Sequence, residues 1–272
     1  MSLSSRSPAP SPAPPAIVTR LRAAGCVFAE DEARLLVAAA RTPAELDAMV
    51  RRRADGLPLE HVLGWAEFCG LRLVVEPGVF VPRPRTGFLV RQAAALTRPG
   101  AVVVDLCCGT GALGAALAAA AAAGPIEVHA VDVDPAAVRC ALRNLAEVGG
   151  RVYEGDLYAP LPAALRGRVD VVVASPPYVP TRAIGLLPPE AREHEPKVAL
   201  DGGADGLDVV RRVVAGASGW LAPGGSLLVE TSESQAGKTA EAVARAGLVT
   251  RLTWDDELDA SAVIGTLPVP VG

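Results

Sequence analysis

The feature that most constrains the fold is the alternation of two apolar patterns from Ala101 onward. Short runs rich in valine, leucine and alanine alternate with longer segments whose apolar residues recur at helical spacing. This alternation is typical of parallel strands joined by right-handed helical crossovers. The predicted strands are 101–106, 127–132, 151–154, 169–174 and 225–231, and the predicted helices are 111–123, 135–147, 206–219 and 234–246. Two final apolar stretches, 248–254 and 261–268, have no helix between them, so the sequence predicts an α/β, Rossmann-like, mixed seven-stranded sheet that ends in an antiparallel pair.

Residues 16–64 have the pattern of a small helical domain. Thr42 and Pro43 predict a helix start, because threonine is a good N-cap and proline is tolerated in the first turn. Glu45 stands three residues after Thr42, as in a capping box. The preceding residues, 1–15, are rich in serine and proline and predict a disordered tail.

Residues 65–84 predict a β-hairpin linker between the helical domain and the sheet domain. Two apolar runs, 71–75 and 79–81, are separated by Glu76-Pro77-Gly78, a sequence typical of a turn. We therefore expect these two runs to be the strands of the hairpin. The sheet domain then covers residues 85–272.

Charge and cysteine content argue against several classes of function. The net charge is −4, whereas proteins that hold nucleic acid by its phosphates carry a basic excess, so direct nucleic-acid binding is not expected. The five cysteines include no Cys-x-x-Cys pair, which favours free thiols and a cytoplasmic location. Cys107 and Cys108 with His129 lack the spacing of a metal site, so no metal is expected. The longest apolar stretch, Ala112 to Ala123, is too short to span a membrane.

Three acidic residues lie at the ends of three successive predicted strands. Asp105 precedes a tight turn, Gly109-Thr110-Gly111, and glycine lets a ligand approach the backbone closely. Asp132 ends the next strand, where a carboxylate can accept both hydroxyls of a ribose, and Asp156 ends the third, beside the expected adenine. The alternative is that Asp132 and Asp134 only cap the following helix; we expect Asp134 to cap and Asp132 to bind. The sequence therefore predicts a nucleoside-containing cofactor at the carboxyl edge of the sheet.

The buried strand 169–174 runs straight into Ser175-Pro176-Pro177-Tyr178. Prolines fix the backbone and donate no hydrogen bond, so this turn is rich in acceptors and ends with an aromatic ring. The combination suits a planar NH₂ group, whose hydrogens bind the acceptors and whose face the ring covers. An ordinary β-turn is the alternative, and Pro-Pro-Tyr directly after a buried strand disfavours it.

Segment 105–111 together with Asp132 resembles motifs one and two of the class I S-adenosylmethionine-dependent methyltransferases, with Cys107 at the position of the first glycine. Ser175 to Tyr178 resembles the Asn-Pro-Pro-Tyr motif of methyltransferases that act on planar amino groups. Further similarity, to the PrmC/HemK-type protein-(glutamine-N5) methyltransferases, lies in Pro58–Gly64, Glu67-Phe68, Phe80–Pro84 and Glu195–Leu200. The chain resembles a divergent subgroup of that family, with Ser-Pro-Pro-Tyr in place of Asn-Pro-Pro-Tyr.

The resemblance implies a class I methyltransferase fold, S-adenosyl-L-methionine as cofactor, and methyl transfer to the side-chain amide N5 of a glutamine in a protein. In this family the acceptor is typically the glutamine of the Gly-Gly-Gln motif of a peptide-chain release factor, and a sister group acts on a ribosomal protein. Residues 16–64 are then expected to bind the substrate protein. Two departures concern the acceptor: Ser175 replaces the family's asparagine, and Arg85 and Gly87 replace acidic residues.

The expected site has a cofactor part and an acceptor part. For cofactor binding we expect Asp105, Cys107, Gly109, Gly111, Asp132, Asp156, Leu157 and Ser175. For catalysis we expect Ser175, Pro176 and Tyr178, and for substrate binding Phe80, Pro82, Arg83, Pro177 and Tyr178. Two other functions stay open: a nucleic-acid adenine amino methyltransferase, which needs a base-reading surface, and a binding module that keeps the cofactor pocket without catalysis.

Overall fold

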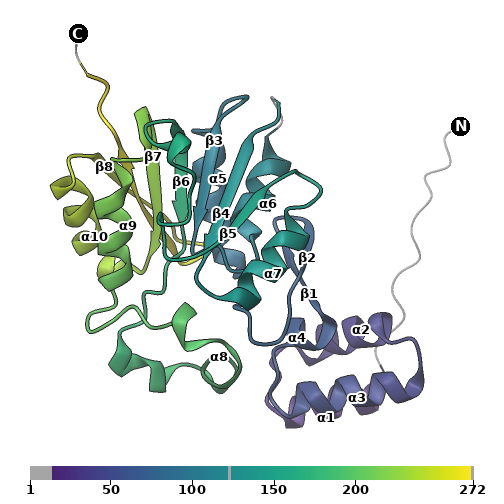
Figure 1. Ribbon diagram of the computed structural model, residues 1–272. Helices are drawn as coiled ribbons and strands as arrows, with labels where there is room; N and C mark the ends of the chain where they lie inside the picture. The colour runs from purple at the N-terminus through teal and green to yellow at the C-terminus, as the bar shows by residue number, and fades with distance from the viewer. Residues whose placement is uncertain (1–13, 122–123, 271–272) are drawn as a thin grey trace, which may run out of the picture. The chain divides into compact units, whose positions relative to one another are not determined.

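The computed structural model describes residues 14–121 and 124–270 (Figure 1). The chain divides into two compact units, Met1–Leu63 and Gly64–Gly272. Of the predicted tail over 1–15, Pro14 and Pro15 are described, and Pro15 already begins the first helix; the rest lies outside the described residues.

The first unit is a small bundle of helices. Its elements are α1 (Pro15–Ala23), α2 (Ala29–Ala39), α3 (Pro43–Ala54) and α4 (Leu59–Leu63). The predicted cap of α3 is confirmed, because the Glu45 backbone N–H donates to Thr42 Oγ1 over 3.1 Å. The Glu45 carboxylate accepts from Arg41 N over 2.8 Å, one residue earlier than a capping box places it. A buried ion pair between Arg53 and Glu32, at 2.6 Å, joins α3 to α2.

The second unit begins with a hairpin, but its strands differ from the prediction. They are β1 (Trp65–Phe68) and β2 (Leu71–Val74), which pair antiparallel around a turn at Cys69 and Gly70. Both turn residues have positive φ, 49° and 77°, as a two-residue hairpin turn requires. The expected second strand, 79–81, is wrong, because the Val81 backbone N–H bonds to a side chain, Glu195 Oε1, instead of a neighbouring strand.

A mixed seven-stranded sheet forms the centre of the second unit, as predicted. Its strands are β3 (Val102–Leu106), β4 (Glu127–Asp132), β5 (Arg151–Glu154), β6 (Val169–Ala174), β7 (Leu221–Thr231), β8 (Val249–Asp255) and β9 (Ala260–Thr266). They lie in the order β5-β4-β3-β6-β7-β9-β8, and β9 runs antiparallel to both of its neighbours. The chain order therefore reverses between β3 and β6, which are adjacent in the sheet but far apart in sequence.

Helices cover both faces of this sheet (Figure 1). One face packs against α5 (Gly87–Ala94), α6 (Ala112–Ala120) and α7 (Pro135–Asn144), and the other against α9 (Asp208–Ala217) and α10 (Glu233–Arg245). Shorter helical segments lie in the connections: η1 (Pro84–Thr86), η2 (Ala163–Leu165), η3 (Thr181–Leu186), α8 (Pro189–His194) and η4 (Lys197–Ala199). Among the described residues, no helix has the length and apolar character needed to cross a membrane.

Candidate active site at the carboxyl edge of the sheet

The carboxyl ends of four parallel strands, β4, β3, β6 and β7, lie side by side at one edge of the sheet. In open α/β sheets, ligands bind at this edge, where the strand order reverses. Here the reversal falls between β3, which carries Asp105, and β6, which leads into Ser175. The topology thus brings the predicted cofactor turn and the predicted acceptor turn together.

Asp105 is completely buried near the end of β3. Its Oδ2 accepts the Gly114 backbone N–H over 3.0 Å, whereas its Oδ1, like Thr110 Oγ1, has no partner among the described residues. Burial raises the pKa of Asp105 to about 7, and the nearby Asp132 carboxylate adds to this shift. Glycine at position 114 lets the backbone of α6 lie this close to the sheet, because a Cβ there would lie 2.9 Å from a Val128 side-chain carbon. An acceptor atom without a partner is thus held near the carboxyl edge of the sheet, where the cofactor is expected.

The Asp132 carboxylate accepts backbone hydrogen bonds from two loops, the one after β3 and the one after β4. Its Oδ2 accepts the Gly109 N–H over 2.8 Å, and its Oδ1 accepts the Asp134 N–H over 2.9 Å. Burial raises the pKa of Asp132, although these two hydrogen bonds oppose the shift. The predicted cap of α7 is confirmed, because Asp134 Oδ1 accepts from Ala136 N over 2.8 Å. Asp132 as the ribose ligand stays a prediction.

The turn after β3 contains left-handed backbone at Cys107, Gly109 and Gly111, with φ of 55°, 54° and 75°. At Gly111 a Cβ would also lie 3.2 Å from both Ala141 and Leu145 of the neighbouring segment, so glycine is required for packing as well. Cys107 carries a Cβ, so its left-handed backbone conformation is strained by about 1–2 kcal/mol relative to an ordinary conformation. The cysteine at the family's first glycine position therefore keeps a glycine-like backbone.

This strain gives a first prediction. At an ordinary site glycine is less stable than alanine by about 0.5–1 kcal/mol, but at Cys107 the order should reverse. Cys107→Gly should unfold at a higher temperature than Cys107→Ala, by about 2–4 °C per kcal/mol gained. Thermal unfolding of the two variants, each compared with the parent protein, measures the difference. A higher melting temperature for Cys107→Ala would show that the turn relaxes around the side chain.

Asp156 and Leu157 follow β5 at the same edge. The Asp156 carboxylate forms an ion pair with Arg212 of α9, and more than half of each side chain is exposed. Leu157 is buried, with a φ of 50°. An exposed pair of this kind contributes little stability. Asp156 is therefore placed near the cofactor edge with a carboxylate that already has a cationic partner.

The predicted acceptor turn, Ser175 to Tyr178, is held by a hydrogen bond at each end. Ser175 Oγ donates to Glu230 Oε2 of β7 over 2.8 Å, and the Tyr178 carbonyl accepts from Gln235 Nε2 over 2.9 Å. Between them Pro176 and Pro177 are buried. The Tyr178 hydroxyl accepts from Arg85 Nη2. Burial raises the pKa of Tyr178, with the Glu230 charge adding to the shift and Arg85 opposing it. The ring and the serine thus have fixed positions.

Residues 80–85, the segment before α5, are held in place through Arg83. Arg83 Nη2 lies 2.6 Å from Glu195 Oε2, and its guanidinium stands 4.7 Å from the centre of the Phe80 ring. Pro82 is half-buried between them in the chain. The segment reaches the acceptor turn through Arg85, which bonds to Tyr178.

Sequence reasoning missed three residues of this region. Glu230 accepts from Thr86 as well as from Ser175, and Glu195 binds Arg83. Glu230 had a usable signal, since it follows a run of buried strand residues as Asp132 does. Thr86 had none, because its partner lies more than a hundred residues away in the chain. Glu195 begins a segment that resembles the family, but that resemblance does not indicate its contact with the distant Arg83.

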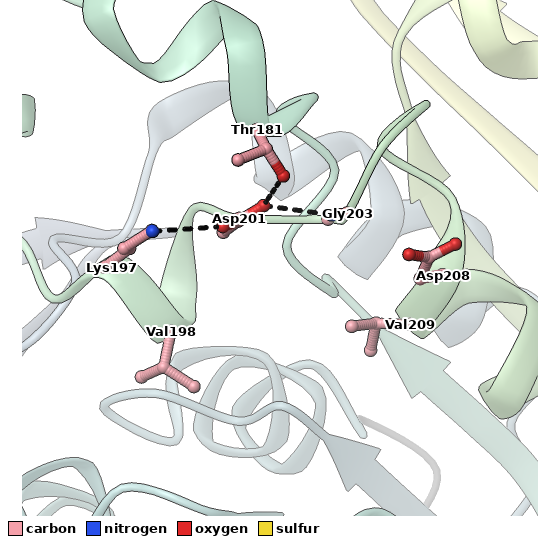
Figure 2. A pocket seen from close by; sticks show the side chains of 8 residues that line it. Thr181, Lys197, Val198, Asp201, Gly203, Asp208 and Val209 are labelled. Carbon is pink, nitrogen blue, oxygen red and sulfur yellow. Dashed lines mark hydrogen bonds and ion pairs between the residues drawn. The ribbon is translucent and has the colours of Figure 1, made fainter.

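A cavity of about 440 Å³ lies beyond the acceptor turn (Figure 2). Thr181, Lys197, Val198, Asp201, Gly202, Gly203, Asp208 and Val209 line it, so it contains none of the residues expected from the sequence. The loop that lines the cavity is hydrogen-bonded to the residue after the acceptor turn, since Gly202 N donates to Val179 O over 2.9 Å. Asp201 fixes the loop by accepting from Thr181 Oγ1 over 2.6 Å and from Gly203 N over 3.0 Å. The cavity therefore lies next to the predicted acceptor turn, and none of the residues predicted to bind the cofactor line it.

Known proteins match this arrangement. The model of the methyltransferase small domain matches residues 71–186. A solved structure, the 16S rRNA N2 G1207 methyltransferase of T. Thermophilus in complex with AdoMet and guanosine, shares the fold with a TM-score of 0.55 and 20% identity, over 75% of this chain and 49% of that one.

Two curated relatives are much closer in sequence. A 4-amino-L-phenylalanine/4-methylamino-L-phenylalanine methyltransferase of Streptomyces pristinaespiralis is 42% identical over 68% of this chain and 65% of its own length. A release factor glutamine methyltransferase of Geobacter sulfurreducens is 40% identical over 82% of this chain and 78% of its own length. At that identity and coverage the family is established, and the chain belongs to the release factor glutamine methyltransferase family.

Proposed function

We propose that the protein transfers a methyl group from S-adenosylmethionine to the side-chain amide N5 of a glutamine, and that this glutamine belongs to a peptide-chain release factor. The curated relative of that name supports the reaction and the substrate. The observation that carries the proposal is the junction of β3 and β6, which sets the Asp105 turn beside the Ser175 turn. A donor and an acceptor bound at these two turns would meet at one sheet edge.

The cofactor half of the site fits a cationic nucleoside cofactor. The partnerless Asp105 Oδ1 offers an acceptor to an ammonium group, and Gly109 and Gly111 leave room for the methionine chain. We assign the ribose to Asp132 and the adenine to Asp156 and Leu157, with Cys107 and Ser175 completing the pocket. S-adenosylmethionine supplies a sulfonium-bound methyl group that a nitrogen lone pair can attack.

The acceptor half works mainly by alignment. An amide nitrogen is a poor nucleophile, so positioning and exclusion of water must supply much of the rate enhancement. We assign the NH₂ hydrogens to Ser175 Oγ and to the carbonyl of Pro176, and the amide face to the Tyr178 ring. Pro177 fixes the turn between them. Phe80, Pro82 and Arg83 would cover the substrate from the other side.

The helical unit, residues 16–64, is proposed to bind the substrate protein. Its loop between α1 and α2 exposes Val27 by 81% and Phe28 by 69%, and apolar residues exposed this far are suited to a protein contact. A cytoplasmic location belongs to the same proposal and is supported by the five cysteines, all of them in the described part of the chain and none of them in a disulfide.

Methyl transfer from labelled S-adenosylmethionine to a purified release factor tests the proposal, with the modified residue mapped by peptide mass spectrometry. We expect label on the glutamine of Gly-Gly-Gln and at least about a hundredfold less label with Asp132→Ala, because an acid that holds both the turn and the ribose is lost. No label on the release factor, with cofactor binding intact, would exclude this acceptor.

A second acceptor is favoured by one residue. Ser175 has a single hydroxyl in place of the family's asparagine, so it cannot hold an amide through paired hydrogen bonds. The NH₂ group of a primary arylamine has no carbonyl beside it, so one acceptor can hold it, and the relative of Streptomyces pristinaespiralis is named for such an amine and for its N-methyl derivative. Offering 4-amino-L-phenylalanine and the release factor in the same assay decides between them by the ratio of kcat/KM.

A further inference from the structure

Glu230 is a buried acid at the end of β7, directly beside the acceptor turn. In the parallel pair of β6 and β7, Val229 stands opposite Ala174, so Glu230 is the neighbour of Ser175. Only 5% of Glu230 is exposed. Its carboxylate accepts from Ser175 Oγ over 2.8 Å and from Thr86 Oγ1 over 3.0 and 3.1 Å.

The charged and titratable groups that face Glu230 come from two segments. Arg85 Nε stands 3.8 Å from Glu230 Oε1, and Tyr178 lies close enough for the Glu230 charge to raise its pKa. The Arg83 charge acts on the pKa of the same tyrosine, more weakly than the Arg85 charge. From the helix after β7, Gln235 contacts the tyrosine carbonyl and carries no charge. Glu230 is therefore held as an acceptor of two hydroxyl protons beside one guanidinium.

This arrangement decides which way the Ser175 hydroxyl points. A serine hydroxyl has one hydrogen to donate and two lone pairs. Since that hydrogen is directed to Glu230 Oε2, only lone pairs remain for a substrate NH₂ group. Without Glu230 the hydroxyl would rotate freely and present its hydrogen to the nitrogen in part of the molecules.

We propose that Glu230 is a positioning residue that keeps Ser175 a hydrogen-bond acceptor and takes up, through the Ser175 hydroxyl, the proton that the nitrogen loses on methylation. The N–C bond forms as the C–S bond breaks, and sulfur keeps the electron pair. The nitrogen then carries one proton too many. That proton passes to Ser175 Oγ while the serine proton passes to Glu230, whose acid form later releases it to solvent. The inference rests on the proposed methyl transfer to a nitrogen.

The test is single-turnover methyl transfer across a range of pH, together with cofactor affinity. Glutamine at position 230 has one acceptor oxygen for two hydroxyls and cannot take up a proton. We expect Glu230→Gln to slow transfer about 100-fold or more with cofactor affinity changed less than about twofold, since positioned proton acceptors contribute 10²–10⁴ to rates. The cofactor is kept saturating at every pH, so that protonation of Asp105 does not limit binding. Under that condition the wild-type rate should fall toward low pH, and this acid limb should be absent from the variant.

Further variants separate this role from a structural one. Ser175→Ala should slow methyl transfer by the same factor and should also lack the acid limb, whereas Ser175→Thr should keep both the rate and the acid limb of the wild type. The double variant Glu230→Gln/Ser175→Ala should be no slower than either single variant. These serine variants keep the test valid if Glu230→Gln does not fold. Glu233→Gln, an exposed acid three residues further on, is the matched control and should match the wild type.

Each outcome bears on the inference. Full activity of Glu230→Gln, or losses that multiply in the double variant, would overturn the inference while the proposed function stands. A wild-type protein that methylates neither the release factor nor the arylamine, although it binds the cofactor, would overturn the proposed function and the inference together.

Discussion

Asp105→Asn is expected to raise the melting temperature of the cofactor-free protein at pH 8 while abolishing cofactor binding. Burial raises the pKa of Asp105 from 3.8 to about 7. Between these two values the folded protein binds more protons than the unfolded chain, so stability falls as the pH rises through this window. The full cost, about 4 kcal/mol for three pKa units, is therefore present above pH 7 and absent below pH 4.

Asparagine removes that charge but places an NH₂ group near the position where Asp105 Oδ1 has no partner. A buried donor without a partner costs about 1–3 kcal/mol, so the net gain at pH 8 should be about 2 kcal/mol. For a domain of this size that gain corresponds to about 4–8 °C. Thermal unfolding at pH 8 and pH 4 measures it. At pH 4, where Asp105 is neutral and only the cost of the unpaired donor remains, the variant should be less stable than its parent by about 2 kcal/mol.

Asp134→Asn is the matched control, because asparagine caps a helix as well as aspartate does and should leave the pH profile unchanged. Isothermal titration with the cofactor completes the test. A variant that binds the cofactor normally, or is no more stable than its parent at pH 8, would contradict the role given to Asp105. The same reasoning predicts that wild-type affinity for a cationic cofactor falls as the pH drops below about 7, because Asp105 becomes neutral.

Glu195→Ala should destabilise the second unit by about 1–3 kcal/mol, because it removes the acceptor of a buried backbone N–H and the buried partner of a half-exposed arginine. The Glu195 side chain is 1% exposed and accepts from Arg83 at 2.6 Å on both oxygens and from Val81 N at 3.1 Å. Its loss leaves the buried Val81 N–H without this acceptor and frees the segment that carries Phe80. Denaturant unfolding measures the stability.

Glu193→Ala is the matched control, since Glu193 is exposed and forms an ion pair with its sequence neighbour Arg192. It should change stability by less than about 0.5 kcal/mol. Glu195→Gln should fall between the two, because the amide keeps one acceptor oxygen. If Glu195→Ala is as stable as Glu193→Ala, the Arg83 pair contributes nothing to the fold.

The pattern of strands and helices is strong enough to predict the sheet, and the limits of that prediction have physical causes. Parallel strands buried on both faces are continuous apolar runs, which is why β3 and β6 were identified within a residue of their bounds. The hairpin was misplaced because Cys69 adopts positive φ, and cysteine gives no turn signal comparable to asparagine or glycine. Pro77 and Gly78 do form a turn, but the chain after it pairs with no strand.

The acceptor region shows a different limit. Ser175 and Tyr178 are recognisable because a buried strand runs into two prolines. The partners that fix them, Glu230 and Arg85, are supplied by other segments, and no local pattern connects them. Contacts between distant segments follow from strand order in the sheet, which a single sequence does not reveal.

The order of the sheet also implies an order of assembly. Val103 pairs with Val128 on one side, 25 residues later in the chain, and with Val171 on the other, 68 residues later. Loop-closure entropy grows with separation, and pairings between distant segments form slowly. We therefore expect the half that carries Asp105 and Asp132 to fold first, and Ser175 to reach its place when β6 pairs with β3. During synthesis the turn after Asp105 would therefore form well before the turn that begins at Ser175.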